Sequence, residues 1–99
     1  MFGMNMSFIE CPEAREMVEN GAQLVDVRSP QEFGMGAIPG SKNVPLQSIY
    51  GAEQYLDKNK PVIVYCASGM RSEQAKGVLS QLGFNSVHNL GSVNKYMSC

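Results

Sequence analysis

The feature that most constrains the fold of this chain is an apolar run at residues 61–65, Pro-Val-Ile-Val-Tyr, with a helical pattern close behind it. The run has the length and the β-branched composition of a buried strand, and Pro61 can begin a strand without losing a ladder hydrogen bond. In residues 72–82 the apolar side chains recur at i, i+3, i+4 and i+7, which predicts an amphipathic helix. A buried strand that leads into a helix is typical of βαβ units, so we expect parallel strand pairing.

Shorter patterns of the same two kinds occupy the rest of the chain. Helices are expected at residues 12–20 and 46–56, the second weakened by Gly51. Residues 29–32, Ser-Pro-Gln-Glu, form a capping-box signature and predict a short helical turn before a loop rich in glycine. Further strands are expected at residues 7–10, 24–27, 42–45 and 84–90, and a tail with at most a short or loose helix at 91–99. These elements predict an α/β fold with a small central parallel β-sheet flanked by helices.

Length and composition indicate one small globular domain over residues 1–99, with an apolar fraction of 43% that can form a core without metal or disulfide. The net charge is -1 and no run of Lys or Arg occurs, which argues against a nucleic-acid partner. No apolar stretch approaches the roughly 20 residues that span a bilayer, so no membrane association is expected. Residues 1–9 lack the basic region of a signal peptide, which predicts a cytoplasmic protein.

The three cysteines, Cys11, Cys66 and Cys99, are odd in number and widely spaced. They form no C-x-x-C pair, and the chain has one histidine, so the sequence predicts no metal site and indicates no cofactor. In a reducing cytosol the cysteines are expected to be thiols, one of them reactive. Cys11 and Cys99 are interpreted as incidental, with a resolving role for Cys99 toward Cys66 as the alternative.

Cys66 is the candidate nucleophile because it ends a strand about five residues before a helix begins. The carboxyl ends of parallel strands are where ligand sites lie in such sheets. The N–H groups of the helix N-terminus and the fixed charge of Arg71 both favour a thiolate. Gly69 can adopt a positive φ, which lets the loop point its N–H groups inward and bind an anion. The predicted chemistry is attack on a sulfane sulfur, with substrate bound by the loop residues Ala67, Ser68, Gly69, Met70 and Arg71.

Each of these assignments has a structural alternative. Cys66 could be a small buried core residue, since free cysteine is among the most buried types. Arg71 could be a solvated helix-start residue, although a positive charge at a helix N-terminus is unfavourable without an anion beside it. Asp26 and Arg28 are interpreted as scaffold, with Arg28 paired to Asp26 or to Glu32 after the strand. Ser72 is expected to support the loop and Met70 to form an apolar rim for the acceptor. His88 is expected to serve packing or to lie at the surface rather than to act as a base.

The order and spacing of these pieces resemble the rhodanese-homology family over nearly the whole chain. The matching segments lie at residues 24–28, 32–33, 36–41, 43–45, 62–72, 82–84, 87 and 89–90. The resemblance implies a sulfurtransferase that moves sulfur from a donor such as thiosulfate to cyanide or a thiol through a persulfide on Cys66. A sulfur-relay protein is a further candidate partner.

The length of the loop distinguishes branches of this resemblance. Four residues separate Cys66 from Arg71, whereas the related phosphatases and arsenate reductases have five between their Cys and Arg, in a larger ring. A smaller ring suits a sulfur atom and should exclude phosphate by size. Two alternatives stay open: a non-catalytic rhodanese-like sulfur carrier or protein-binding module, and a phosphatase or arsenate reductase.

The chain also departs from the family pattern. Ala37 stands where the family commonly has His, and Gly91-Ser92 and Tyr96 stand where it often has Gly-Gly and Trp. None of these positions is the nucleophile, so the departures bear on stability and acceptor choice more than on activity.

Overall fold

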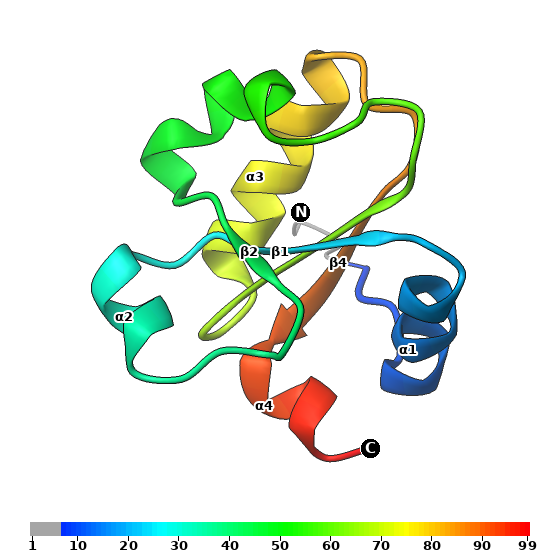
Figure 1. Ribbon diagram of the computed structural model, residues 1–99, viewed down its shortest axis with the longest axis vertical. Coiled ribbons are helices and arrows are strands. Elements are labelled where there is room, and N and C mark those ends of the chain that lie inside the picture. The colour runs from blue at the N-terminus through cyan, green and yellow to red at the C-terminus, as the bar shows by residue number, and fades with distance from the viewer. Residues whose placement is uncertain (1–6) are drawn as a thin grey trace, which may run out of the picture.

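The computed structural model describes residues 7–99 and contains a four-stranded parallel sheet (Figure 1). The strand order is β2-β1-β3-β4, with β1 at Gln23–Asp26, β2 at Lys42–Asn43, β3 at Val62–Cys66 and β4 at Val87–Ser92. The helices are α1 (Cys11–Glu19), α2 (Pro30–Gly34), the 3-10 helix η1 (Leu46–Gln54), α3 (Met70–Gln81) and α4 (Val93–Met97). This arrangement confirms the predicted α/β class.

The sheet separates two apolar layers. On one face, β1 and β3 pack against η1 and α3, and on the other they pack against α1 and α4 (Figure 1). Central strand β3 is buried along its whole length, with Val62, Val64 and Cys66 in the first layer and Ile63 and Tyr65 in the second. Burial on both faces explains why this strand is a continuous apolar run rather than an alternating one.

Several element boundaries differ from the sequence-based expectations. Residues 7–10 form only an isolated bridge from Phe8 to Asn89, and residues 46–54 form a 3-10 helix interrupted at Gly51, whose backbone is non-helical. The tail is more ordered than expected, because β4 continues to Ser92 and α4 follows at once. Residues 84–86 precede β4, and Phe84 is buried where its N–H donates to Leu79 at the end of α3.

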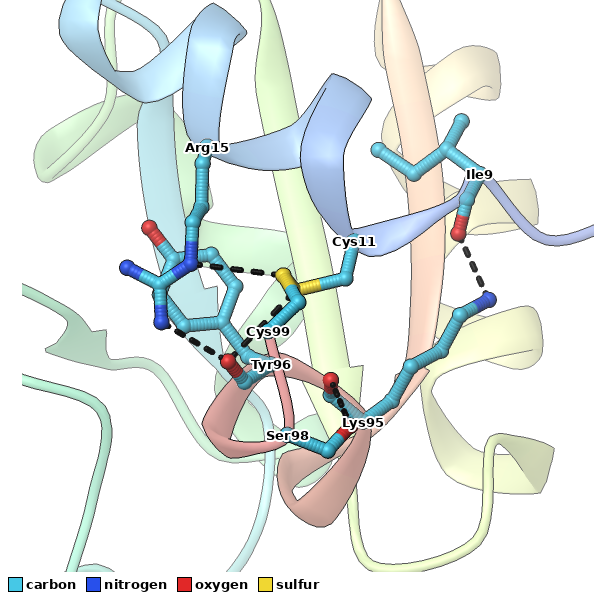
Figure 2. The surroundings of a disulfide bond; sticks show 7 residues. All are labelled: Ile9, Cys11, Arg15, Lys95, Tyr96, Ser98 and Cys99. Carbon is cyan, nitrogen blue, oxygen red and sulfur yellow. Dashed lines mark hydrogen bonds between the residues drawn. A yellow bond between two sulfur atoms is a disulfide. The ribbon is translucent and has the colours of Figure 1, made fainter.

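A disulfide joins Cys11, at the start of α1, to Cys99, and their Cα atoms are 6.2 Å apart (Figure 2). The expectation that Cys11 and Cys99 are incidental thiols is therefore wrong. The two residues are 88 positions apart, and only the packing of α1 on α4 brings them together. Disulfides persist in oxidising compartments and are rare in the cytosol, so this bond counts against the predicted cytoplasmic location, which stays a prediction.

Polar contacts surround the disulfide and hold the C-terminal segment to α1 (Figure 2). Arg15 Nη2 donates to the Tyr96 carbonyl at 2.9 Å, and the Arg15 guanidinium carbon lies 4.2 Å from the centroid of the Tyr96 ring. Lys95 Nζ donates to the Ile9 carbonyl at 2.6 Å. Arg15 Nε also donates to Cys99 Sγ at 3.4 Å, so residues 9–15 are joined to the C-terminal segment by the disulfide, a stacked cation and side-chain hydrogen bonds.

Within residues 7–99, no helix has the length and apolar character needed to cross a membrane. In the same part of the chain, the acidic, cysteine and histidine side chains form no group of three or more that could hold a metal ion.

Candidate active site

Cys66 is the last residue of β3 and is fully buried at the carboxyl end of the sheet. The chain then passes through Ala67 and Ser68, both exposed, to Gly69, which has φ +102° and is the N-cap of α3. This φ lies in the left-handed region that glycine adopts without steric cost. The turn directs the Gly69 N–H at Cys66 Sγ over 2.9 Å. The predicted strand–Cys–loop–helix arrangement is therefore present, with the helix beginning at Met70 rather than at residue 72.

The surroundings of Cys66 favour its thiolate. Burial raises the pKa of the Cys66 thiol, but hydrogen bonds from the Ser72 hydroxyl and from the N–H groups of Ser72, Gly69 and Ser68 lower it. The balance places the Cys66 pKa below the ordinary value of a cysteine. Ser72 is itself buried in the first turn of α3, with Oγ 3.4 Å from Cys66 Sγ. Ser72 thus contacts the sulfur directly, which is a closer role than the loop support expected of it.

Arg71 forms a bidentate ion pair with Glu32 across the mouth of the loop. Its Nη1 and Nη2 donate to the two carboxylate oxygens of Glu32 at 2.7 and 3.0 Å. Arg71 lowers the Glu32 pKa to about 2, aided by the N–H of Ser29. Glu32 is positioned by the predicted capping box, in which Ser29 Oγ accepts from the Glu32 N–H at the start of α2. The charge of Arg71 is therefore shared between the Cys66 loop and α2.

Asp26, the last residue of β1, and Arg28 form a buried pair, which is one of the two pairings that the sequence left open. Arg28 Nη2 lies 2.7 Å from Asp26 Oδ2, and it also donates to the Gly36 carbonyl at 2.7 Å. Asn43 Nδ2 donates to the carbonyls of Asp26 and Arg28, which ties β2 to the same corner. These contacts fix the loop that leads into α2, and hence the position from which Glu32 reaches Arg71.

The remaining predicted residues lie at the rim or away from the sulfur. Met70 is 54% exposed beside the loop, where it can form the apolar rim expected of it. His88 Nε2 hydrogen-bonds Ser86 Oγ at 2.8 Å on β4. Ile38, which follows the altered position Ala37, is buried, and its N–H donates to the Tyr65 hydroxyl at 3.1 Å.

The sequence interpretation did not identify Glu32 or Asn89 as part of this site. Glu32 was predicted as a helix cap and a possible partner of Arg28, and its long-range contact with Arg71 depends on the tertiary arrangement of α2 and α3. Asn89 lies in one of the segments that carry the family resemblance, but that match gave it no role at the site, although an Asn within a buried strand is itself unusual. It is fully buried, and its amide donates to the Gly69 carbonyl at 3.2 Å.

A family model for the rhodanese-like domain matches residues 10–99. The chain belongs to the rhodanese-like domain family. This membership confirms the resemblance drawn from the sequence segments. Relatives named thiosulfate sulfurtransferase place the chain with the rhodanese-type sulfurtransferases as a class of enzyme.

Single-domain relatives of this rhodanese-like chain carry the same class name. It is 38% identical over 78 residues to thiosulfate sulfurtransferase GlpE of Pseudomonas aeruginosa (strain LESB58), covering 79% of this chain and 71% of the relative. It is also 38% identical over 71 residues to thiosulfate sulfurtransferase PspE of Escherichia coli (strain K12), covering 70% of this chain and 68% of that protein.

Solved structures agree with the rhodanese assignment. A rhodanese from E. coli, solved with anions, superposes with a TM-score of 0.69 at 35% identity, covering 76% of this chain and 91% of that one. The human single-domain sulfurtransferase TSTD1 covers 95% of this chain and 97% of its own length with a TM-score of 0.81. At 24% identity, the human protein is evidence for the fold alone.

Proposed function

We propose that this chain transfers sulfane sulfur from a donor such as thiosulfate to a thiophilic acceptor, cyanide or a thiol, through a persulfide on Cys66. The observation that carries the proposal is the position of Cys66 Sγ, buried at the end of β3 with the Gly69 N–H 2.9 Å away and Ser72 Oγ 3.4 Å away. These donors stabilise an anion at one atom, which is what a thiolate nucleophile requires.

The cycle has two balanced steps. In the first, the Cys66 thiolate attacks the outer sulfur of thiosulfate, an S–S bond forms to Cys66, and the S–S bond of thiosulfate breaks to release sulfite. In the second, the acceptor attacks the outer sulfur of the Cys66 persulfide. The bond to Cys66 breaks, thiocyanate forms when cyanide is the acceptor, and the Cys66 thiolate returns. The first step needs no general base, because Cys66 is already a thiolate, and the second needs none when the acceptor arrives as cyanide ion or as a thiolate.

Different residues of the Cys66 loop bind different parts of the sulfur donor. The backbone N–H groups of Ser68 and Gly69 face the Cys66 sulfur and suit the anionic persulfide. Arg71 has five N–H donors, of which its pair with Glu32 uses two, so the guanidinium can bind the sulfonate of thiosulfate while it stays paired. Met70 supplies the apolar side of the entrance, where an acceptor thiol or a sulfur-relay protein would approach.

The proposal is tested by thiocyanate formation from thiosulfate and cyanide, with the native protein and the Cys66→Ala variant compared. We expect the substitution to abolish turnover while circular dichroism reports an unchanged fold. Mass spectrometry after incubation with thiosulfate should show the addition of one sulfur atom to the native protein and none to the variant. Turnover by Cys66→Ala would overturn the mechanism.

The other outcomes separate the rival functions. An inactive native protein that accepts a persulfide sulfur on Cys66 from another persulfide-bearing protein would be a sulfur carrier. One that accepts no sulfur at all would be a binding module. Hydrolysis of a generic aryl phosphate would instead assign the chain to the phosphatases.

A further inference from the structure

Gly69 is the hinge of the Cys66 loop, the residue at which the loop turns into α3. It has no side chain that could fix the orientation of its backbone. Its backbone occupies the left-handed region, it caps α3 without a side chain, and glycine is the residue with the most backbone freedom. Yet its N–H must face Cys66 Sγ for the hydrogen bond at 2.9 Å to form. The Glu73 N–H donates to the Gly69 carbonyl at 3.1 Å as the first hydrogen bond of α3, and a second donor from outside the loop reaches the same carbonyl.

Asn89 provides that second donor from the neighbouring strand β4. Its amide Nδ2 donates both to the Gly69 carbonyl at 3.2 Å and to the Glu73 carboxylate at 2.9 Å. Its Oδ1 accepts from the Gly91 N–H at 2.9 Å, which fixes which way the amide points. One fully buried side chain thus connects β4 to both the hinge of the loop and the first turn of α3.

The backbone of Asn89 is also held by hydrogen bonding. The Ile9 N–H donates to the Asn89 carbonyl at 3.0 Å, next to the bridge between Phe8 and Asn89. The Phe8 ring lies over the hinge, close enough that a Cβ on Gly69 would come within 3.0 Å of it. Gly69 is therefore confined by two hydrogen bonds on its carbonyl, from the Asn89 amide and the Glu73 N–H, and by the Phe8 ring beside its Cα.

We propose that Asn89 is a positioning residue for Cys66: by binding the Gly69 carbonyl it aims the Gly69 N–H at the sulfur and so stabilises the thiolate. As far as it concerns sulfur transfer, this inference rests on the proposed function. After transfer, the same N–H group faces the sulfur that carries the persulfide. Asn89 touches neither donor nor acceptor in this role, and its effect passes entirely through the loop.

The first test measures the thiol without relying on sulfur transfer. All three cysteines lie in the described residues, and Cys66 is the free one, so the pH profile of alkylation by iodoacetamide reports on Cys66 alone. We expect Asn89→Ala to move this profile to higher pH. The charged groups around the loop are Arg71 and Glu73 on α3 and Glu32 on α2, with the Asp26–Arg28 pair behind them, and Asn89→Ala alters none of their charges.

The matched control is Asn43→Ala. Asn43 also donates two hydrogen bonds from its amide, but to the carbonyls of Asp26 and Arg28. We expect this variant to lose stability and to displace the alkylation profile less than Asn89→Ala, because Asn43 acts on the Cys66 loop only through Glu32 and Arg71. An unchanged profile in folded Asn89→Ala, or an equal displacement in Asn43→Ala, would overturn the proposal.

A second variant covers the case in which Asn89→Ala fails to fold. Asn89→Asp combined with Glu73→Gln keeps the net charge and nearly the same side-chain volumes. The new amide at position 73 can donate to the new carboxylate, so the link to α3 is retained in reverse. The Gly69 carbonyl loses the side-chain donor on β4 and keeps only the backbone N–H of residue 73. We expect the pH profile of Cys66 alkylation in this double variant to lie at higher pH than in the native protein. A native profile would show that the contact between Asn89 and Gly69 is irrelevant.

Sulfur transfer gives the third measurement. We expect Asn89→Ala to lower kcat/KM for thiocyanate formation about 10-fold or more, because misplacement of a reacting group by about 1 Å can cost 10²-fold. Glu73→Gln alone should keep the native rate within about 2-fold, because the half-buried side chain keeps an oxygen that accepts from Asn89. If thiosulfate is no substrate for the native protein, the proposed function fails, while the alkylation profile still decides the role of Asn89.

Discussion

The molecule contains two sulfur sites that differ in almost every respect. Cys66 is a free thiol at the end of the central strand, surrounded by N–H donors and the Ser72 hydroxyl. Cys11 and Cys99 are joined to each other between the two ends of the chain, among the cation of Arg15 and the ring of Tyr96. The comparison teaches that the surroundings of a cysteine, and not its presence, decide whether its thiolate is stabilised or its sulfur is cross-linked.

The largest expected effect is on sulfur transfer, when a variant that lacks Cys66 is compared with one that lacks the disulfide. Cys66→Ala should eliminate sulfur transfer, whereas Cys11→Ala/Cys99→Ala should retain it at 25 °C, since neither disulfide sulfur contacts the Cys66 loop. Thiocyanate formation by the two variants measures this directly. Loss of transfer in the folded double variant would show that the two sulfur sites are functionally coupled.

The second effect concerns stability, where removal of the disulfide should matter more than removal of the Cys66 thiol. The disulfide closes a loop that includes nearly the whole chain. Removing a native disulfide typically costs about 2–5 kcal/mol of stability, because the unfolded chain then gains conformational entropy. Urea unfolding of Cys11→Ala/Cys99→Ala should therefore show a much lower midpoint than that of Cys66→Ala. A reductant should lower the midpoint of the native protein and leave the double variant unchanged, which is the internal control.

A third effect separates the loop from the helix that follows it. Gly69→Ala should destabilise the protein by about 1–2 kcal/mol, because an L-residue is strained at φ +102°, and its Cβ would press on the Phe8 ring. Gly77→Ala, within α3 and with open space at its Cβ, should stabilise by about 0.5–1 kcal/mol. Urea unfolding and transfer rates of both variants test this, and an equally tolerated Gly69→Ala would contradict the described loop geometry.

The smallest effect is the pH dependence of the Arg71–Glu32 pair. Because the Glu32 pKa is lowered to about 2 in the folded protein, its contribution to stability is present above the unfolded value of 4.5 and is lost as the pH falls toward 2. Both side chains are more than one third exposed, so the contribution is small and screened by salt. NMR titration of the Glu32 carboxyl checks the direction. Glu32→Gln should remove this component, and a Glu32 that titrates near 4.5 would show that the pair does not form in solution.

Residues close in sequence allowed most of the fold to be predicted. Three of the patterns were the apolar run of β3, the i, i+3, i+4, i+7 spacing of α3 and the capping box of α2. Each depends on residues a few positions apart, so the sequence of the segment alone predicts the element. The errors fell where local signals are weak. Residues 7–10 lack enough pairing to be a strand, and the region around Gly51 becomes a 3-10 helix under the packing of its apolar side chains against α3.

The candidate site divides in the same way. The sequence by itself determined the loop from Cys66 to Arg71, because strand, turn and helix are contiguous and a glycine marks the positive φ of the turn. Only the tertiary structure decided that Glu32 binds Arg71, that Asn89 holds Gly69 and that Cys11 is bonded to Cys99. Each of these contacts joins residues from 20 to 88 positions apart. Such pairs meet only when the sheet order and the packing of α1 on α4 are set, and no local pattern of charge or hydropathy encodes that.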